Sequence, residues 1–350
     1  MKTLWYGGTI YTMISEGDTT EAVLTDGDKI IQTGTYEQLA PLAEQQQFLN
    51  GAVMYPGFID SHIHLESSIV SPPDFAKLVA LHGTTAVITD PHEIANVCGI
   101  DGIRWIIEKT NNLPIDVYIM IPSCVPASPF DESAYILDSK SIKECYNLNT
   151  NGKILGLAEM MNYPGVINND KEVYEKIKIT KEKNLIIDGH APGVIGKEFE
   201  KYISAGIESD HECRTLFEAK EKLDIANKMN KRFYIMIRQG TAAKNLEALY
   251  ELINIPEYKE YTTFATDDKH PEEIYEDGHI DSIIRKAIKL GASPIDTYIT
   301  ASYNAAKYFK LNDICISYPD GFISFISCLY NSTRLLNSSS SASLTHIFPS

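Results

Sequence analysis

Histidine and carboxylate side chains recur along this sequence at the ends of short apolar runs. The first are His62 and His64, two positions apart at the end of the run 57–63. Alternate residues of a strand project to the same face, so both imidazoles can face one site. Imidazole together with carboxylate suits Mn, Fe or Zn ions in mixed nitrogen and oxygen sites. A lone H-x-H pair is also common among exposed histidines, so a metal site depends on what the later runs supply.

The later runs supply the rest of such a site. Six residues at run ends have side chains that a transition metal prefers, namely His62, His64, Glu159, His190, His211 and Asp267. A single catalytic metal with an open position typically uses three protein ligands, so six ligands favour two metals. Glu159, on the fourth run, is the carboxylate expected to bridge them. Two ions would acidify a shared water and make it a hydroxide nucleophile.

Eight apolar runs rich in β-branched residues are the strand candidates that must position these side chains. They cover residues 57–63, 84–89, 116–122, 154–159, 185–190, 206–210, 233–238 and 262–267. Amphipathic helical windows such as 171–183 and 214–229 lie between several of them. The alternation predicts an α/β fold, a (β/α)8 TIM barrel, although it also suits an open doubly wound sheet. The capable residues follow strand after strand at one end, where such barrels carry their active sites, and this favours the barrel.

The chain length fits this architecture with sequence left over. A barrel takes about 250 residues, and the chain has 350. Two β-like segments, 3–12 and 21–33, come first, so we predict a small, incomplete β element over residues 1–51. The barrel is expected over 52–310. Residues 311–350 are predicted to be a divergent, poorly ordered tail, because they contain a serine run and little pattern.

Composition limits the partners and the compartment. The formal charge is −16, and an acidic surface repels phosphate backbones, so nucleic-acid polymers and membranes are excluded as partners. The six cysteines lack C-x-x-C spacing, which argues against disulfide frameworks and favours the reducing cytoplasm. Neither a signal peptide nor a run of the roughly 20 apolar residues that span a bilayer is found. Whether the chain forms a homo-oligomer stays open.

Several segments carry a resemblance to a known family. Residues 56–64, PGFIDSHIH, resemble the first-strand signature of the amidohydrolase superfamily. Later segments are similar in sequence and order to motifs of bacterial and archaeal adenine deaminases, namely 65–68, 90–97, 122–127, 156–165, 188–193, 209–212, 242–246 and 266–268. The resemblance covers residues 3 to about 321.

The resemblance implies hydrolysis of a C–N bond in a cyclic amidine, with a purine as the small-molecule substrate: adenine and water give hypoxanthine and ammonia. It also implies that the six ligands hold two divalent ions, Mn²⁺ or Fe²⁺ with Zn²⁺ as an alternative. Many superfamily members have a carboxylated lysine on the fourth strand, where this subfamily is expected to use glutamate, and Glu159 agrees. Asp267 is the expected general base and acid, with Asp268 as the alternative one residue away.

Other polar residues at the strand ends are expected to contact the substrate. These are His92, Glu93, Ser123, Cys124, Arg238, Gln239 and Asp268. His92 and Glu93 could instead bind a further metal, or form an ion pair that caps the next helix. Arg238 and Gln239 could instead hold the metal ligands in position without contacting the substrate. Cys124 is expected to line the purine site and not to act as a nucleophile, because no base is paired with it.

The chain departs from the family pattern near residues 316–321, whereas the family continues well past 350 residues. We therefore expect a C-terminally truncated member whose first strands lack partners and leave open edges. Two alternatives remain. One is another amidohydrolase, acting on cyclic amides or N-acetyl amino sugars, against which the segment 90–97 and Glu159 weigh. The other is an inactive truncated remnant that only binds metal.

Overall fold

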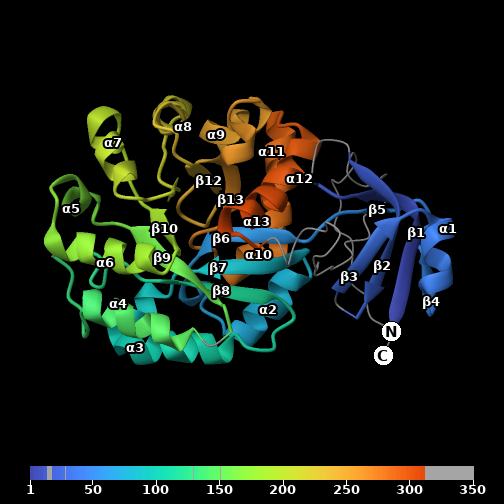
Figure 1. The fold of residues 1–350 in the computed structure, drawn as a ribbon, viewed down its shortest axis with the longest axis horizontal. Helices are drawn as coiled ribbons and strands as arrows, with labels where there is room; N and C mark the ends of the chain where they lie inside the picture. The colour runs from blue at the N-terminus through green and yellow to red at the C-terminus, as the bar shows by residue number, and fades with distance from the viewer. Residues whose placement is uncertain (14–17, 28, 129, 150, 312–350) are drawn as a thin grey trace.

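The structure, a computed structural model, describes residues 1–311 apart from 14–17, 28, 129 and 150. The tail predicted over 311–350 therefore lies outside the described residues, except for Leu311. The described part consists of a small sheet at the N-terminus followed by a ring of parallel strands covered by helices (Figure 1).

The small sheet is built from the first five strands. Its order is β3-β2-β1-β4, with β5 beside β1. The three strands β1, β2 and β3 are antiparallel, as the predicted hairpins require, whereas β4 and β5 run parallel to β1. The strands are β1 (Lys2–Tyr11), β2 (Thr19–Asp26), β3 (Lys29–Gly34), β4 (Gln45–Phe48) and β5 (Val53–Met54).

Eight parallel strands form the second unit, and all eight coincide with predicted runs. They are β6 (Phe58–Ile63), β7 (Thr84–Thr89), β8 (Asp116–Ile121), β9 (Ile154–Met160), β10 (Ile186–Gly189), β11 (Ser209–Asp210), β12 (Tyr234–Arg238) and β13 (Thr262–Ala265). The first five pair in one sheet and the last three in another.

Backbone hydrogen bonds join these two sheets at both seams. At one seam the Asp267 amide donates to the carbonyl of His62 at 2.9 Å, and the His64 amide donates to the carbonyl of Asp267 at 3.2 Å. At the other, the Glu208 amide donates to the carbonyl of Ile187 at 3.0 Å. The strands therefore close into the predicted (β/α)8 barrel, and the open doubly wound sheet is wrong.

Helices lie around the ring and begin at recognisable capping residues. The Asp170 carboxylate accepts from the amides of Glu172 and Val173 at the start of α6, and the Thr215 hydroxyl accepts from the Glu218 amide at the start of α8. Both helices match predicted windows. The helices are α1 (Tyr36–Leu39), α2 (Pro72–Ala80), α3 (His92–Lys109), α4 (Ser139–Cys145), α5 (Tyr163–Ile167), α6 (Lys171–Glu182), α7 (Gly196–Ser204), α8 (Leu216–Lys228), α9 (Leu246–Leu249), α10 (Pro271–Asp277), α11 (Ile280–Leu290), α12 (Pro294–Ala301) and α13 (Tyr303–Phe309).

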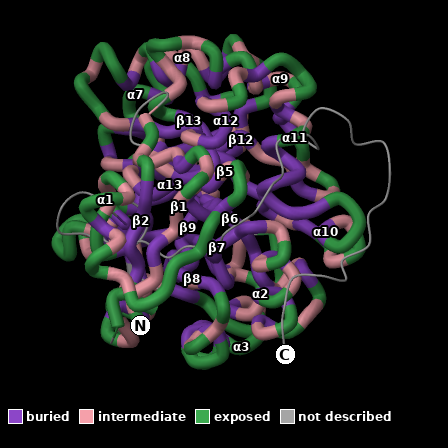
Figure 2. Tube along the Cα trace, turned by 90° about the vertical axis from the view of Figure 1, so that its right-hand side faces the viewer, coloured by how far each residue is buried: buried purple, intermediate pink, exposed green. Residues whose placement is uncertain are grey.

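Barrel strands are buried on both faces (Figure 2). Neighbouring residues of one strand serve different cores: Ile186 packs inside the barrel, whereas Ile187 packs outward against the helices. At the amino ends of the strands, α13 closes the barrel interior with Tyr308 and Phe309, and the Tyr308 ring lies 4.6 Å from that of Tyr234. Because these side chains fill the barrel at the amino ends of the strands, the barrel can hold a site only at the carboxyl ends.

Stacked aromatic rings connect the small sheet to the barrel. The Tyr55 ring lies between those of Tyr11 and Tyr298, with centroid distances of 5.3 and 4.1 Å. Tyr11 belongs to β1 and Tyr298 to α12. Among the helices that the structure describes, none combines the length and the apolar character needed to cross a membrane.

Candidate metal centre

The structure brings the six predicted ligands together at the carboxyl end of the barrel. His62 belongs to β6 and Glu159 to β9. His64, His190 and His211 directly follow β6, β10 and β11, and Asp267 lies two positions after β13 ends. Five of the side chains are at most 8% exposed and His190 is 24% exposed. Gly189 permits the close approach of β10 and β11, because a Cβ atom there would lie 2.0 Å from the Ser209 carbonyl oxygen.

Glu159 lies between two groups of histidines. Its Oε1 atom is 3.4 Å from His64 Nε2 and 3.8 Å from His62 Nε2. Its Oε2 atom is 2.7 Å from His190 Nδ1 and 3.2 Å from His211 Nε2. One carboxylate oxygen thus faces each group, which is the arrangement that a carboxylate bridging two cations needs.

Asp267 completes the group around His62 and His64. Its Oδ1 atom lies 3.0 Å from His64 Nε2 and 3.5 Å from His62 Nε2, and its Oδ2 atom accepts a hydrogen bond from Arg238 at 2.6 Å. The residue has a left-handed backbone, with φ of 58°, two positions after β13 ends. Such a conformation is strained for a residue other than glycine and is often found at functional sites.

The electrostatics of the site suit a cation. Burial opposes ionisation of Glu159, but hydrogen bonds from three histidines hold its pKa well below the usual value. Burial likewise opposes the charge on His211, but Glu159 raises its pKa to about 9. In the metal-free protein the Glu159 carboxylate is therefore charged and His211 carries a proton, which a metal ion displaces when it binds.

One buried atom tests whether the donor set fits a metal. His62 Nε2 is buried and has no hydrogen-bond partner. An imidazole nitrogen in that position normally has a partner, because burying a polar atom without one is unfavourable. Four histidines and two carboxylates are also the donor types that Mn, Fe and Zn accept. The residues present therefore fit the metal pair that the sequence predicts.

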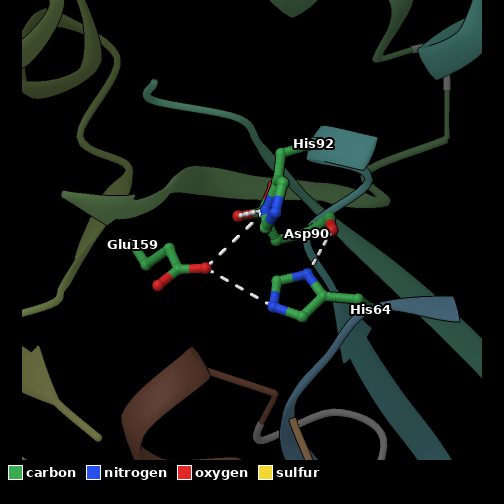
Figure 3. Close-up of side chains that lie close together, drawn as sticks. All are labelled: His64, Asp90, His92 and Glu159. Carbon is green, nitrogen blue, oxygen red and sulfur yellow. Dashed lines mark hydrogen bonds and ion pairs between the residues drawn. The ribbon is translucent and has the colours of Figure 1, made fainter. Parts of the chain in front are cut away.

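His92 lies at the edge of this cluster, together with a residue that sequence reasoning left out of the site. Figure 3 shows His64, Asp90, His92 and Glu159 around a common centre. His92 Nδ1 is 3.1 Å from Asp90 Oδ2 and 3.7 Å from Glu159 Oε1. Asp90 directly follows β7, and that position at a strand end was the signal that could have identified it.

The structure separates Glu93 and Ser123 from the ligands. Glu93 is exposed, and its carboxylate accepts a hydrogen bond from the Ser67 hydroxyl at 3.0 Å. The Ser123 hydroxyl donates to the backbone carbonyl of Glu159, so it supports this residue from behind. Cys124 is buried, and burial raises the pKa of its thiol, which keeps the group neutral.

Arg238 connects Asp267 to Glu212, a second residue absent from the predicted set. Glu212 accepts from Arg238 at 2.5 Å and lies 3.6 Å from His211 Nε2. Its place directly after His211 was the available signal. With the partly buried Gln239, Arg238 and Glu212 line a cavity of about 600 Å³ beside the cluster. Asp268 is partly buried, and its Oδ1 atom has no hydrogen-bond partner.

A second buried charged cluster starts one residue before His211. The Lys222 ammonium group, on α8, donates to Asp210, Glu218 and the carbonyl of Ala191, each at 2.7 Å. Asp210, Glu218 and Cys213 lie close enough together to hold an ion. Lys222 already supplies the positive charge there, so this cluster is structural.

Comparison with known proteins places these features in a family. The profile of the Amidohydrolase family matches residues 53–314. Adenine deaminase of Clostridium acetobutylicum is 45% identical over 289 residues, which are 83% of this chain and 48% of that protein. Adenine deaminase of Thermosipho melanesiensis is 45% identical over 274 residues, 77% of this chain and 46% of that protein. The chain spans about half the length of the curated relatives it matches.

Solved structures support the fold at much lower identity. An enamidase of the amidohydrolase superfamily has a TM-score of 0.63 at 12% identity, covering 92% of this chain and 85% of its own. A dihydroorotase has a TM-score of 0.59 at 17% identity, covering 92% of this chain and 86% of its own. At these identities the likeness concerns the barrel and the small sheet, and not the substrate.

Proposed function

Because this chain belongs to the amidohydrolase family, we propose that it deaminates adenine by hydrolysis at the site around Glu159. The observation that carries the proposal is the position of Glu159, with one carboxylate oxygen facing His62 and His64 and the other facing His190 and His211. The identity of 45% to adenine deaminases supports adenine as the substrate.

In the proposed reaction, water adds to the ring carbon that bears the exocyclic amine. A C–O bond forms, the C–N bond to that amine breaks, and a proton from water leaves with the nitrogen as ammonia. The product is hypoxanthine, and no oxidant or reductant takes part. Bound divalent ions supply the acidification of the attacking water.

Six side chains are proposed to hold two such ions. His62, His64 and Asp267 would bind one, and His190 and His211 the other, with Glu159 shared between them. The nitrogen and oxygen donors support Mn²⁺ or Fe²⁺, and Zn²⁺ is the alternative. Ligand type alone does not select among these metals, because affinity follows geometry and supply as well.

Asp267 is the proposed proton carrier. Its Oδ1 atom faces the histidine pair and its Oδ2 atom is held by Arg238. Burial opposes ionisation, but the neighbouring His62 and His64 imidazoles hold the pKa of Asp267 far below its usual value, so the group starts as a base. A carboxylate fixed at one oxygen can take a proton from water and pass it to the departing nitrogen.

Substrate contacts are proposed for Arg238 and Gln239, which line the adjoining cavity, and for Asp268 and Cys124. Arg238, Gln239 and Asp268 would bind the purine ring from one side, and Cys124 would form an apolar wall. Ser123, whose hydroxyl donates to the Glu159 backbone carbonyl, and Glu93, which accepts from the Ser67 hydroxyl, stay proposed as further substrate contacts. The charge of −16 supports a small-molecule substrate over a nucleic-acid polymer, and the four free thiols of the described residues support a cytoplasmic location.

Ammonia release from adenine by Mn- or Fe-loaded protein tests the proposal. His62→Ala and Glu159→Ala are each expected to lower the rate by about a thousand-fold or more, because each removes a ligand at the reacting centre. His82→Ala is the matched control, since His82 precedes β7 at the opposite end of the barrel. If folded, metal-loaded wild type releases no ammonia from adenine, the proposal fails, and cyclic amides become the next substrates to assay.

A further inference from the structure

We infer that Asp90 and His92 form a third cation position beside the proposed metal pair, and that this position takes a divalent transition-metal ion. The inference rests on the proposed function in one respect, because Glu159 is shared with that pair and the Nε2 atom of His64 is assigned to the pair. Asp90 and His92 belong to the third position alone. They come from the loop after β7 and from the first residue of α3.

Donor spacing is the first argument. Donor atoms of His64, Asp90, His92 and Glu159 all lie within 4.8 Å of one another. The separations measured between pairs are 3.1 Å for His92 Nδ1 to Asp90 Oδ2 and 3.4 Å for His64 Nε2 to Glu159 Oε1. Two donors that each lie about 2.1 Å from one metal in tetrahedral geometry are roughly 3.4 Å apart. With His92 Nδ1 also 3.7 Å from Glu159 Oε1, Asp90, His92 and Glu159 are thus spaced as ligands of one ion.

An unpartnered buried atom is the second argument. Asp90 is 1% exposed, and its Oδ1 atom has no hydrogen-bond partner. A simple ion pair with His92 employs only Oδ2, so it leaves half of the carboxylate unsatisfied. Burying a carboxylate oxygen without a partner is unfavourable. A cation between Asp90, His92 and Glu159 neutralises this oxygen as well.

The orientation of His64 is the third argument. Its Nδ1 atom donates to the backbone carbonyl of Asp90 at 2.8 Å, which turns Nε2 towards Glu159 (Figure 3). A histidine ligand typically donates its other nitrogen to a carbonyl or carboxylate, which fixes its tautomer. Asp90 thus contributes twice, with its backbone orienting a ligand and its side chain offering another donor.

The donor set selects the class of ion. One imidazole and two carboxylates suit Mn²⁺, Fe²⁺ or Zn²⁺. Ca²⁺ and Mg²⁺ prefer sites made of oxygen atoms alone, so they are poor candidates. His92 is 16% exposed, so this ion lies nearer to solvent than the pair and is expected to exchange more easily.

Metal content tests the inference directly. The full chain is loaded with excess Mn²⁺, desalted, and its metal-to-protein ratio measured by inductively coupled plasma mass spectrometry. We expect about three ions per chain in wild type and about two in His92→Ala, with circular dichroism showing that the fold is kept. His82→Ala is the matched histidine control and is expected to keep the wild-type ratio. Equal ratios in wild type and His92→Ala overturn the inference. A fall from about two to about one also overturns it, because His92 would then be a ligand of the pair.

A second measurement covers the case in which His92→Ala does not fold. Anomalous diffraction from wild-type crystals at the Mn absorption edge should give a peak next to His92 Nδ1 and Asp90, apart from those of the pair, and its absence overturns the inference. Ammonia release measured on the same preparations separates the two proposals. A third ion without deamination of adenine leaves the cation position standing and the proposed function rejected. Deamination of adenine by protein that holds only two ions supports the proposed function and overturns the third cation position.

Discussion

Asp210 and His211 are neighbours in the chain but belong to two buried charged clusters of opposite character. Asp210 is 0% exposed and meets Lys222 and, through it, Glu218. His211 is 2% exposed and meets Glu159 at the metal centre. Both clusters contain carboxylates that water does not reach. They differ in where the compensating positive charge comes from.

The first cluster carries its own cation. All three hydrogens of the Lys222 ammonium group have acceptors, and although burial opposes it, this cation holds the pKa of Asp210 well below the usual value. The second cluster leaves His62 Nε2 and Asp90 Oδ1 without partners. We therefore infer that the cluster whose positive charge comes from Lys222 is structural. The cluster that keeps unpartnered polar atoms is expected to bind an ion from solution.

Removing the lysine should break this distinction with the largest effect of any single substitution. Lys222→Met keeps the length of the side chain but leaves Asp210 and Glu218 without a cation. Removing one partner of a buried pair typically lowers the free energy of unfolding by about 3–5 kcal/mol. Urea denaturation monitored by circular dichroism measures the loss. Lys228→Met, at an exposed position of the same helix, should change little, and equal losses in the two variants would contradict the structural role of Lys222.

Removing metal should affect only the other cluster. A chelator that strips the protein should lower the free energy of unfolding by about 3 kcal/mol for each ion held at a hundred times its dissociation constant. Thermal denaturation before and after chelation should then differ by about 5 °C for each ion removed. In Glu159→Gln the difference should shrink, because the shared ligand is weakened. If chelation does not change the stability of the wild type, the histidine cluster is stable without a bound ion and the distinction fails.

The sequence predicted the barrel because each of its eight strands is an apolar run and a capable residue follows almost every one. It predicted the six ligands for the same reason, since strand ends meet at one face of a barrel. It did not predict Asp90 or Glu212 as site residues. Glu212 directly follows His211 and Asp90 lies two positions before His92, and the sequence of a loop after a strand does not tell which of several nearby side chains turns inward. The burial of Lys222 is harder still to predict, because a lysine on an amphipathic helix is usually solvated. Only tertiary packing buries it against Asp210.

A buried carboxylate whose positively charged partners are side chains of the same protein should also show the pH dependence of an ion pair. Asp281 is 6% exposed, with the guanidinium of Arg285 and the imidazole of His82 beside it and the His279 amide donating to it at 2.8 Å. Burial opposes its charge, but these partners lower its pKa to about 2.

A folded pKa below that of the unfolded chain stabilises the protein above pH 4, and the contribution disappears as the pH falls towards 2. Asp281→Asn should therefore lower the free energy of unfolding by about 2 kcal/mol at pH 7, and by progressively less below pH 4. Urea titrations across this range measure the difference. Asp101→Asn, at a side chain that is 81% exposed, is the control. A loss that stays constant down to pH 2 would exclude the ionic origin.

The smallest effect is expected where the same charges meet in water. Lys178 lies 3.3 Å from Glu175 and 3.9 Å from Glu182, and all three side chains are at least 47% exposed. Solvent already stabilises these charges, so Lys178→Ala should not shift the urea midpoint measurably. A loss as large as that of Lys222→Met would show that pairing alone stabilises the chain. The contrast between the two lysines therefore tests whether burial, and not the ion pair as such, makes a cation indispensable at Asp210 and, by the same physics, at Glu159.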